Sequence, residues 1–171
     1  MSQSTLPIDR ELASEPASSQ AWWFLGTLAV SRNPVGAPAA PAVIELTVPP
    51  GGSPPRHVHA DLDDAFLMLE GEAFIACGDR SWTARQGSYV VLPQGVEHTF
   101  RVTSTTPAKL LLIHADDSFL RFIAAVGTPT EDRQLPPDDV PTPDFEAVNA
   151  AWEANGGRFT GPSIEAAEVP A

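Results

Sequence analysis

The sequence predicts an all-β fold, a barrel or jelly roll, followed by C-terminal helices. Short apolar stretches recur along the first two thirds of the chain, and several alternate between apolar and polar residues. The chain has 18 prolines and 12 glycines among 171 residues, and they recur at short intervals, which favours turns over long helices. After residue 116 the apolar residues are spaced three and four apart, which is typical of helices.

The chain divides into three predicted parts. Residues 1–20 are rich in Ser, Glu, Pro and Ala without a sustained period, which predicts a flexible N-terminal arm. Residues 21–116 contain the predicted strands and form the barrel, and residues 117–171 form a helical segment and tail. A chain of 171 residues has room for one domain with a core, so two independent domains are not expected.

The barrel is predicted to contain about nine strands, because each apolar run is bounded by turn residues. The first run, at 22–30, is made of the apolar residues 22–25 and 28–30, and the second, at 42–48, alternates before a Pro-Pro-Gly-Gly turn. The remaining strands are expected at 56–60, 65–69, 72–77, 81–85, 88–92, 98–102 and 109–115.

Two helices are predicted after the barrel. Ser118 is expected to cap the first helix, which ends at Gly127, and Asp144 is expected to cap the second, which ends at Gly156. Apolar residues mark one face of each helix: Phe119, Phe122, Ile123 and Val126 in the first, and Phe145, Val148 and Trp152 in the second. The chain after Gly157 is expected to be irregular.

Charge and cysteine content narrow the expected partners and compartment. The net charge of −12 repels phosphate backbones and anionic lipids, so neither a nucleic acid nor a membrane is expected as a partner. The single cysteine, Cys77, cannot form an internal disulfide and is predicted to be buried and structural rather than reactive. The polar N-terminus lacks the basic and apolar regions of a secretory signal, which favours a cytoplasmic location.

Three of the four histidines are spaced as metal ligands. His57 and His59 are two residues apart in a predicted strand, so both side chains leave the same face, with Cα atoms roughly 6 to 7 Å apart. His98 begins a later strand, which an antiparallel barrel could bring beside the first. Carboxylates lie shortly after His59, at positions 61, 63 and 64. Imidazoles with a carboxylate suit iron, manganese, nickel, copper or zinc, so we expect one divalent transition metal ion whose identity stays open.

These residues resemble the two sequence motifs of the cupin superfamily. Similar to the first motif is the stretch Gly-Gly-Ser-Pro-Pro-Arg-His-Val-His at 51–59, followed by Asp64 and Gly71. Similar to the second are Gly87, Pro93, Gly95 and His98. The resemblance covers residues 22 to 115 and implies a double-stranded β-helix barrel. It also implies a metal held by His57, His59, Asp64 and His98.

Aspartate at position 64 departs from the glutamate that the family usually has there. The shorter side chain can bind the ion directly, reach it through water, or hold a histidine, and these alternatives stay open. If Asp64 is not tightly bound to the ion, it is the expected catalytic base for a substrate proton. Asp63 is a rival for the same role, but the six-residue gap to Gly71 favours Asp64.

Alternation along the strands predicts an apolar pocket around the metal. If Asp64 and His98 point inward, every second residue after them does so too. The predicted substrate pocket therefore contains Phe66, Met68, Phe100 and Val102. His114 lies in a run of leucines whose direction the sequence does not fix, so a locally bonded histidine at a strand end is favoured over an active-site role.

A narrower resemblance implies a function. Residues 69–72, 119–122 and 127–129 are similar to single-domain cupins of the quercetin dioxygenase-like kind. This implies a metal-dependent dioxygenase that acts on a small enolisable or hydroxylated aromatic compound. The family resemblance also implies a homodimer, formed through the N-terminal arm and an outer face of the barrel. A binding or regulatory cupin without turnover, and an isomerase or lyase that uses the same ion, are the alternatives.

Overall fold

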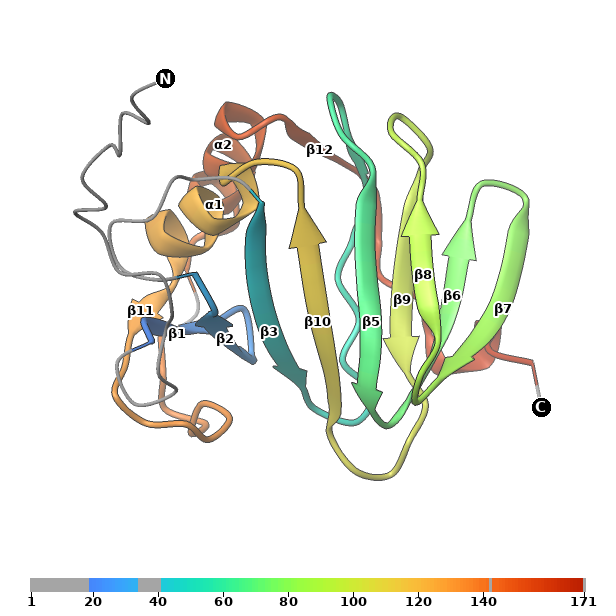
Figure 1. The fold of residues 1–171 in the computed structure, drawn as a ribbon, viewed down its shortest axis with the longest axis horizontal. Helices are drawn as coiled ribbons and strands as arrows, with labels where there is room; N and C mark the ends of the chain where they lie inside the picture. The colour runs from blue at the N-terminus through green and yellow to red at the C-terminus, as the bar shows by residue number, and fades with distance from the viewer. Residues whose placement is uncertain (1–18, 34–40, 142, 171) are drawn as a thin grey trace, which may run out of the picture.

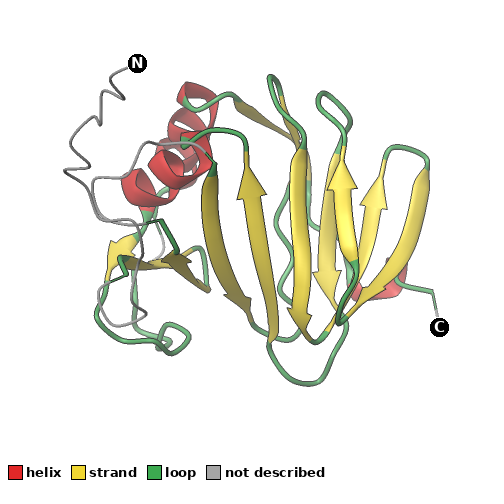
Figure 2. Ribbon diagram, viewed as in Figure 1, coloured by secondary structure: helices red, strands yellow, loops and turns green. Residues whose placement is uncertain are grey.

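The computed structural model describes residues 19–33, 41–141 and 143–170 and shows two antiparallel sheets and two short helices, which belong to the last third of the sequence (Figure 1). This confirms the predicted all-β fold with C-terminal helices. Figure 2 shows that strands form most of the body and that the two α-helices gather at one end. Residues 1–18 of the predicted N-terminal arm lie outside the described residues.

The larger sheet has seven strands, in the order β11-β1-β2-β3-β10-β5-β8. Its bounds are β1 (Ala21–Phe24), β2 (Thr27–Ser31), β3 (Ala42–Val48), β5 (Asp64–Glu70), β8 (Tyr89–Leu92), β10 (Ala108–His114) and β11 (Thr128–Pro129). Every second residue of β10 is buried, from Ala108 to His114, so the period of two turns one face of this central strand toward the core.

The smaller sheet has five strands, in the order β12-β4-β9-β6-β7. Its bounds are β4 (Arg56–His59), β6 (Glu72–Cys77), β7 (Arg80–Arg85), β9 (His98–Val102) and β12 (Gly157–Gly161). The core lies between the two sheets, where Ile44, Met68 and Ile75 are almost completely buried. Cys77 is buried in the same core, as predicted, and the burial raises the pKa of its thiol.

The apolar run at 22–30 forms a hairpin of two strands rather than a single strand. Leu25 and Gly26 connect β1 to β2 in a two-residue turn, and both have left-handed backbone conformations, with φ of 48° and 80°. Glycine adopts this conformation readily, whereas leucine is disfavoured in it. Because leucine is not a typical turn residue, the sequence pattern did not indicate the break.

The helices α1 (Ser118–Val126) and α2 (Phe145–Ala154) follow the barrel close to their predicted positions. Asp144 caps α2, as predicted, because its side chain accepts a hydrogen bond from the N–H of Ala147 (3.3 Å). The predicted cap of α1 is wrong. Asp117 occupies the N-cap position, and the N–H of Ser118 donates instead to Oδ1 of Asp116 (2.8 Å).

The chain after Gly157 forms a strand, which corrects the expectation of an irregular segment. β12 pairs antiparallel with β4, with Gly157 opposite His59 and Phe159 opposite His57. The segment is short and lacks clear alternation, so its pairing with β4 specifies the strand. A short 3-10 helix, η1 (Ala166–Glu168), follows. Within the described ranges, no helix has the length and apolar character needed to span a membrane.

Candidate metal centre

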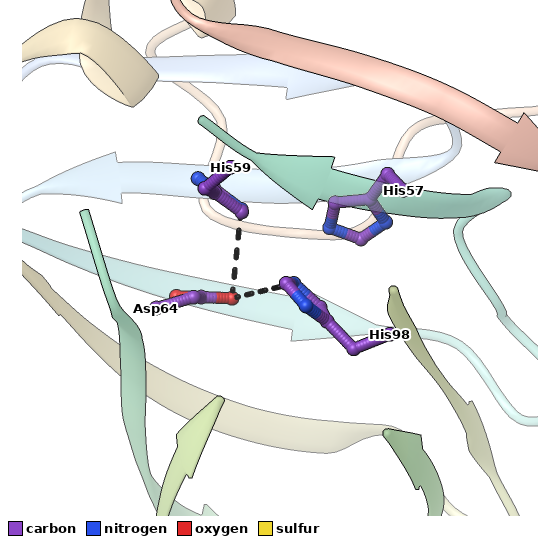
Figure 3. Close-up of side chains that lie close together, drawn as sticks. All are labelled: His57, His59, Asp64 and His98. Carbon is purple, nitrogen blue, oxygen red and sulfur yellow. Dashed lines mark ion pairs between the residues drawn. The ribbon is translucent and has the colours of Figure 1, made fainter. Parts of the chain in front are cut away.

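The neighbouring strands β4 and β9 bring three histidines together. His57 and His59 project from the same face of β4, because side chains alternate along a strand. His98 on β9 lies directly opposite His57, and the centroids of these two rings are 4.5 Å apart. Figure 3 shows the three imidazoles gathered around one point.

Asp64 reaches the same point from the opposite sheet, where it is the first residue of β5 (Figure 3). Its Oδ2 atom lies 3.9 Å from Nε2 of His59 and 3.8 Å from Nε2 of His98. One donor atom from each of His57, His59, Asp64 and His98 lies within 4.8 Å of the others. Donors about 2.1 Å from one cation stand roughly 3 to 4 Å apart, so the four side chains fit a divalent ion after small movements.

Two of the histidines are set in the tautomer that binds a metal through Nε2. Nδ1 of His57 lies 2.7 Å from the carbonyl oxygen of Pro55, and Nδ1 of His98 lies 2.8 Å from that of Val96. A carbonyl oxygen only accepts hydrogen bonds, so each Nδ1 carries the proton and each Nε2 keeps a free lone pair. The same backbone contacts fix the orientation of both rings.

Burial and charge set the protonation states of the site. Desolvation lowers the pKa of His57 to about 4 and the pKa of His59 to about 3. Burial by itself raises the pKa of Asp64, but the contact with His114 and the nearby imidazoles outweigh it, and the pKa of this carboxyl lies below its ordinary value. Neutral imidazoles and a charged carboxylate are the forms that bind a divalent cation.

His114 belongs to this site, which corrects the prediction that it is bonded locally. It ends β10, is fully buried, and places Nε2 2.9 Å from Oδ1 of Asp64. Since Leu112 pairs with Phe66 in the neighbouring strands, continuing the register by two residues brings His114 beside Asp64. His114 shares a face of the strand with Leu110 and Leu112, and this spacing of two was the signal for its placement. The sequence does not show which of the two faces points inward, so the signal could not be interpreted from the sequence alone.

An apolar cavity of about 220 Å³ adjoins the four predicted ligands and His114. Aromatic side chains make up much of its wall: Phe24, Phe100, Phe119, Phe122, Trp152 and Phe159. Of the four side chains predicted to form the substrate pocket, the structure places Phe100 in this wall. Phe66, Met68 and Val102 face inward but lie deeper, buried within the core and outside the cavity lining.

Trp152 of α2 also lines the cavity, in addition to the packing role predicted for it. The centroid of its ring lies 5.0 Å from that of His59 and 5.8 Å from that of His57. Gly157 is so close to the indole that a Cβ there would come within 1.9 Å of Cε2. The segment after the barrel therefore closes one side of the cavity, whereas all the site residues predicted from the sequence lie in the barrel.

Buried polar atoms without a hydrogen-bond partner are concentrated around this cavity. Six such side-chain atoms occur among the described residues, and five belong to residues that line it. They are Oδ1 of Asp64, Nε2 of His98, Nδ1 and Nε2 of His114, and Nε1 of Trp152. The Asp64–His114 contact is short enough for a hydrogen bond but is not aligned as one. Because unpaired buried polar atoms are costly, their clustering indicates a place for a ligand.

Comparison with known families identifies residues 44–114 as a match to the model of the cupin domain, Cupin_2. This range contains all four predicted metal ligands and ends at His114. No curated protein sequence matches the chain.

Solved structures share the fold at low sequence identity. An RmlC-like cupin from Shewanella frigidimarina NCIMB 400 is 15% identical, with a TM-score of 0.53 over 62% of this chain and 91% of that chain. The polyketide cyclase RemF from Streptomyces resistomycificus is 21% identical, with a TM-score of 0.51 over 61% and 78%. Oxalate decarboxylase from Bacillus subtilis is 20% identical, with a TM-score of 0.52 over 64% of this chain but 30% of that chain. These similarities establish the fold.

Proposed function

We propose that the protein is a metal-dependent dioxygenase of the quercetinase-like kind, because residues 44–114 match the cupin-domain model and bring together three histidines and an aspartate. Its substrate is a small enolisable or hydroxylated aromatic compound. The observation that carries the proposal is the set of four donor atoms within 4.8 Å of one another beside an apolar cavity. Imidazoles with a carboxylate form the ligand set of non-haem iron oxygenases and also suit manganese, nickel, copper and zinc.

The side chains around the site prepare it for a divalent ion. His57 and His98 present Nε2, because a backbone carbonyl holds the proton on Nδ1 of each ring. Asp64 adds one negative charge to neutral nitrogen donors, so part of the positive charge stays available to an anionic substrate oxygen. A divalent ion held there supplies Lewis-acid and template chemistry toward an enolate or phenolate oxygen.

The cavity favours a small, flat and largely apolar substrate. Its volume of about 220 Å³ is below the range of roughly 300 to 1,000 Å³ that is usual for drug-sized ligands. Phenylalanine rings line its walls, and its unpaired polar atoms belong to the metal centre and to Trp152. An aromatic compound with its oxygen atoms at one end fits this distribution, since its ring packs against the walls while the oxygens face the ligands.

Asp64 is better suited to bind the cation than to remove a proton from the substrate. A carboxyl whose pKa is held below its ordinary value is a weak base at neutral pH. Its Oδ2 atom faces His59 and His98, which is the position of a ligand rather than of a free base. We therefore propose direct ligation by Asp64, among the alternatives that the sequence left open.

Elemental analysis of the purified protein, followed by oxygen uptake with a flavonol and with a small 1,3-diketone, tests the proposal. We expect a bound divalent transition metal and consumption of oxygen together with substrate. His98→Ala removes one ligand and should lower both metal content and oxygen uptake at least tenfold. Glu97→Ala, an exposed neighbour in the sequence, is the matched control and should change neither.

Other outcomes separate the alternative functions. Product formed without oxygen consumption would identify an isomerase or lyase with the same ion. Stabilisation of the fold by the aromatic compound without any product would identify a binding protein. Unchanged metal content and oxygen uptake in His98→Ala would overturn the metal-dependent reaction itself.

A further inference from the structure

His114 lies beside Asp64, with its Nε2 atom 2.9 Å from Oδ1, and belongs to neither of the two cupin-like motifs. We propose that His114 is a positioning residue that holds Oδ1 of Asp64 and thereby leaves only Oδ2 to bind the cation. The inference rests on the metal site proposed above and adds to it the manner in which the aspartate binds: through one oxygen.

The two oxygens of Asp64 have different surroundings. Oδ1 lies 2.9 Å from Nε2 of His114, whereas Oδ2 lies 3.8 Å from His98 and 3.9 Å from His59. A carboxylate that binds a cation with both oxygens must turn both toward it. The position of His114 opposes that arrangement, because Oδ1 would have to leave its close contact.

The chemistry of the two groups makes Nε2 of His114 the donor. A carboxylate that binds a cation only accepts hydrogen bonds, so the ring nitrogen 2.9 Å from Oδ1 must carry the proton for the contact to be favourable. Neither Nε2 of His114 nor Oδ1 of Asp64 has another hydrogen-bond partner among the described residues. The terminal torsion of aspartate is broad, so turning the carboxylate into alignment with this N–H costs little.

Packing holds the His114 ring in place. Phe119 of α1 stacks on it, with ring centroids 5.1 Å apart and an angle of 20° between the planes. The centroid of His59 lies 5.4 Å away on an inclined plane. Since His114 is completely buried, its ring cannot turn outward to water without disrupting these contacts. Helix α1 therefore contributes indirectly to the orientation of a metal ligand.

Titration of the metal-free full-length protein with Co(II), followed by visible absorption, tests the inference with the metal alone as the probe. His114→Phe keeps a ring to stack on Phe119 but removes the donor, and we expect Co(II) affinity to fall about 10- to 100-fold. The absorption spectrum should change as well, because it reports how many ligand atoms surround Co(II). His114→Gln, whose amide can donate to Oδ1, should recover affinity to within a few-fold.

Two further variants separate the loss of the hydrogen-bond donor from a general loss of protein stability. His114→Asn keeps a polar side chain that is too short to reach Oδ1, and it should resemble His114→Phe. Ile113→Gln changes the adjacent, partly exposed residue of the same strand and should bind Co(II) like the wild type. Circular dichroism verifies that each variant is folded.

Wild-type affinity and an unchanged spectrum in folded His114→Phe or His114→Asn would overturn the inference and leave the metal site intact. A wild-type chain that binds no Co(II), Zn(II), Mn(II) or Ni(II) would overturn the proposed function, and the inference with it. The two failures are therefore distinguishable.

Discussion

The burial of His57 and His59 makes the folded, metal-free protein less stable in acid. The pKa values of His57 and His59 are lowered to about 4 and about 3, mainly because burial disfavours their charged forms. An exposed histidine in the unfolded chain has a pKa near 6.5, so between about pH 6.5 and 4 the unfolded chain binds protons that the folded chain does not. Acid therefore favours the unfolded state through these two residues.

The contribution of His57 and His59 to the free energy of unfolding should be fully present above about pH 6.5 and decline as the pH falls toward about 4 for His57 and about 3 for His59. The slope is at most about 1.4 kcal/mol per pH unit for each histidine. Urea denaturation of the metal-free protein at several pH values measures it.

The control is the double variant His57→Gln, His59→Gln, whose unfolding free energy should depend less on pH over the same range. Other groups also titrate below pH 5, so the difference between the two proteins is the relevant quantity. Identical pH profiles would contradict the assignment of the lowered pKa values to these residues.

The cluster of His57, His59, Asp64 and His98 could be predicted from the sequence because the evidence for it is local. Residues His57 and His59 share a strand face at a spacing of two, and the spacing of the flanking glycines and prolines resembles two known motifs. His114 could not be placed in the same way. Its role depends on the pairing of β10 with β5. Residues 110–112 are all leucine, so the sequence does not show which face of the strand points inward.

At the scale of elements, β12 and α2 support the strand that carries two of the ligands. β12 pairs with β4 along most of its length, and Gly157 lies opposite His59. The backbone of Gly157 is also in contact with the indole of Trp152, which lines the cavity. The packing of Gly157 against Trp152 therefore affects the position of His59, because β12 and β4 are paired.

Gly157→Ala should destabilise the protein by about 1 to 3 kcal/mol, because the new methyl group would lie 1.9 Å from Cε2 of Trp152 and the ring must move. Urea denaturation measures the loss, and tryptophan fluorescence reports the displacement of the ring. Gly161→Ala on the same strand is the control: its nearest contact would be the Arg56 side chain at 3.3 Å, and we expect a clearly smaller effect. Equal stability of the two variants would contradict the tight packing described for Trp152.

The barrel strands were predictable as elements, and the exceptions have a common cause. Runs such as β3 and β9 combine apolar patterning with turn residues at both ends, so local sequence and tertiary structure agree. The turn at Leu25 and the strand β12 carry no such local signal. Pairing with neighbouring strands determines both, and propensity alone does not contain that information.

At the scale of the whole molecule, the candidate metal centre takes its side chains from both sheets. His57, His59 and His98 belong to the five-stranded sheet, whereas Asp64 belongs to the seven-stranded sheet. A cation bound to both sets therefore links them directly, in addition to the apolar core between them. A cation that binds the folded state and not the unfolded state stabilises the folded state by mass action.

Removal of the metal by a chelator should lower the melting temperature. At a free metal concentration of 100 times the Kd, binding contributes about 2.7 kcal/mol, which corresponds to roughly 5 to 10 °C for a chain of this size. Differential scanning calorimetry with and without chelator measures the shift, and added metal should reverse it.

The same calorimetry on His98→Ala provides the control, because a protein without the site should show no chelator-dependent shift. A melting temperature that chelation leaves unchanged in the metal-loaded wild type would contradict the link between the sheets.

The pairing of β4 with β12 also has a consequence for biosynthesis. About 100 residues separate His57 from its partner Phe159, and ribosomes make the chain from its N-terminus, so the histidine strand emerges long before the strand that flanks it. Until translation reaches β12, a growing polypeptide exposes His57 and His59 on an uncovered sheet edge. The pocket is therefore completed only after β12 has been synthesised.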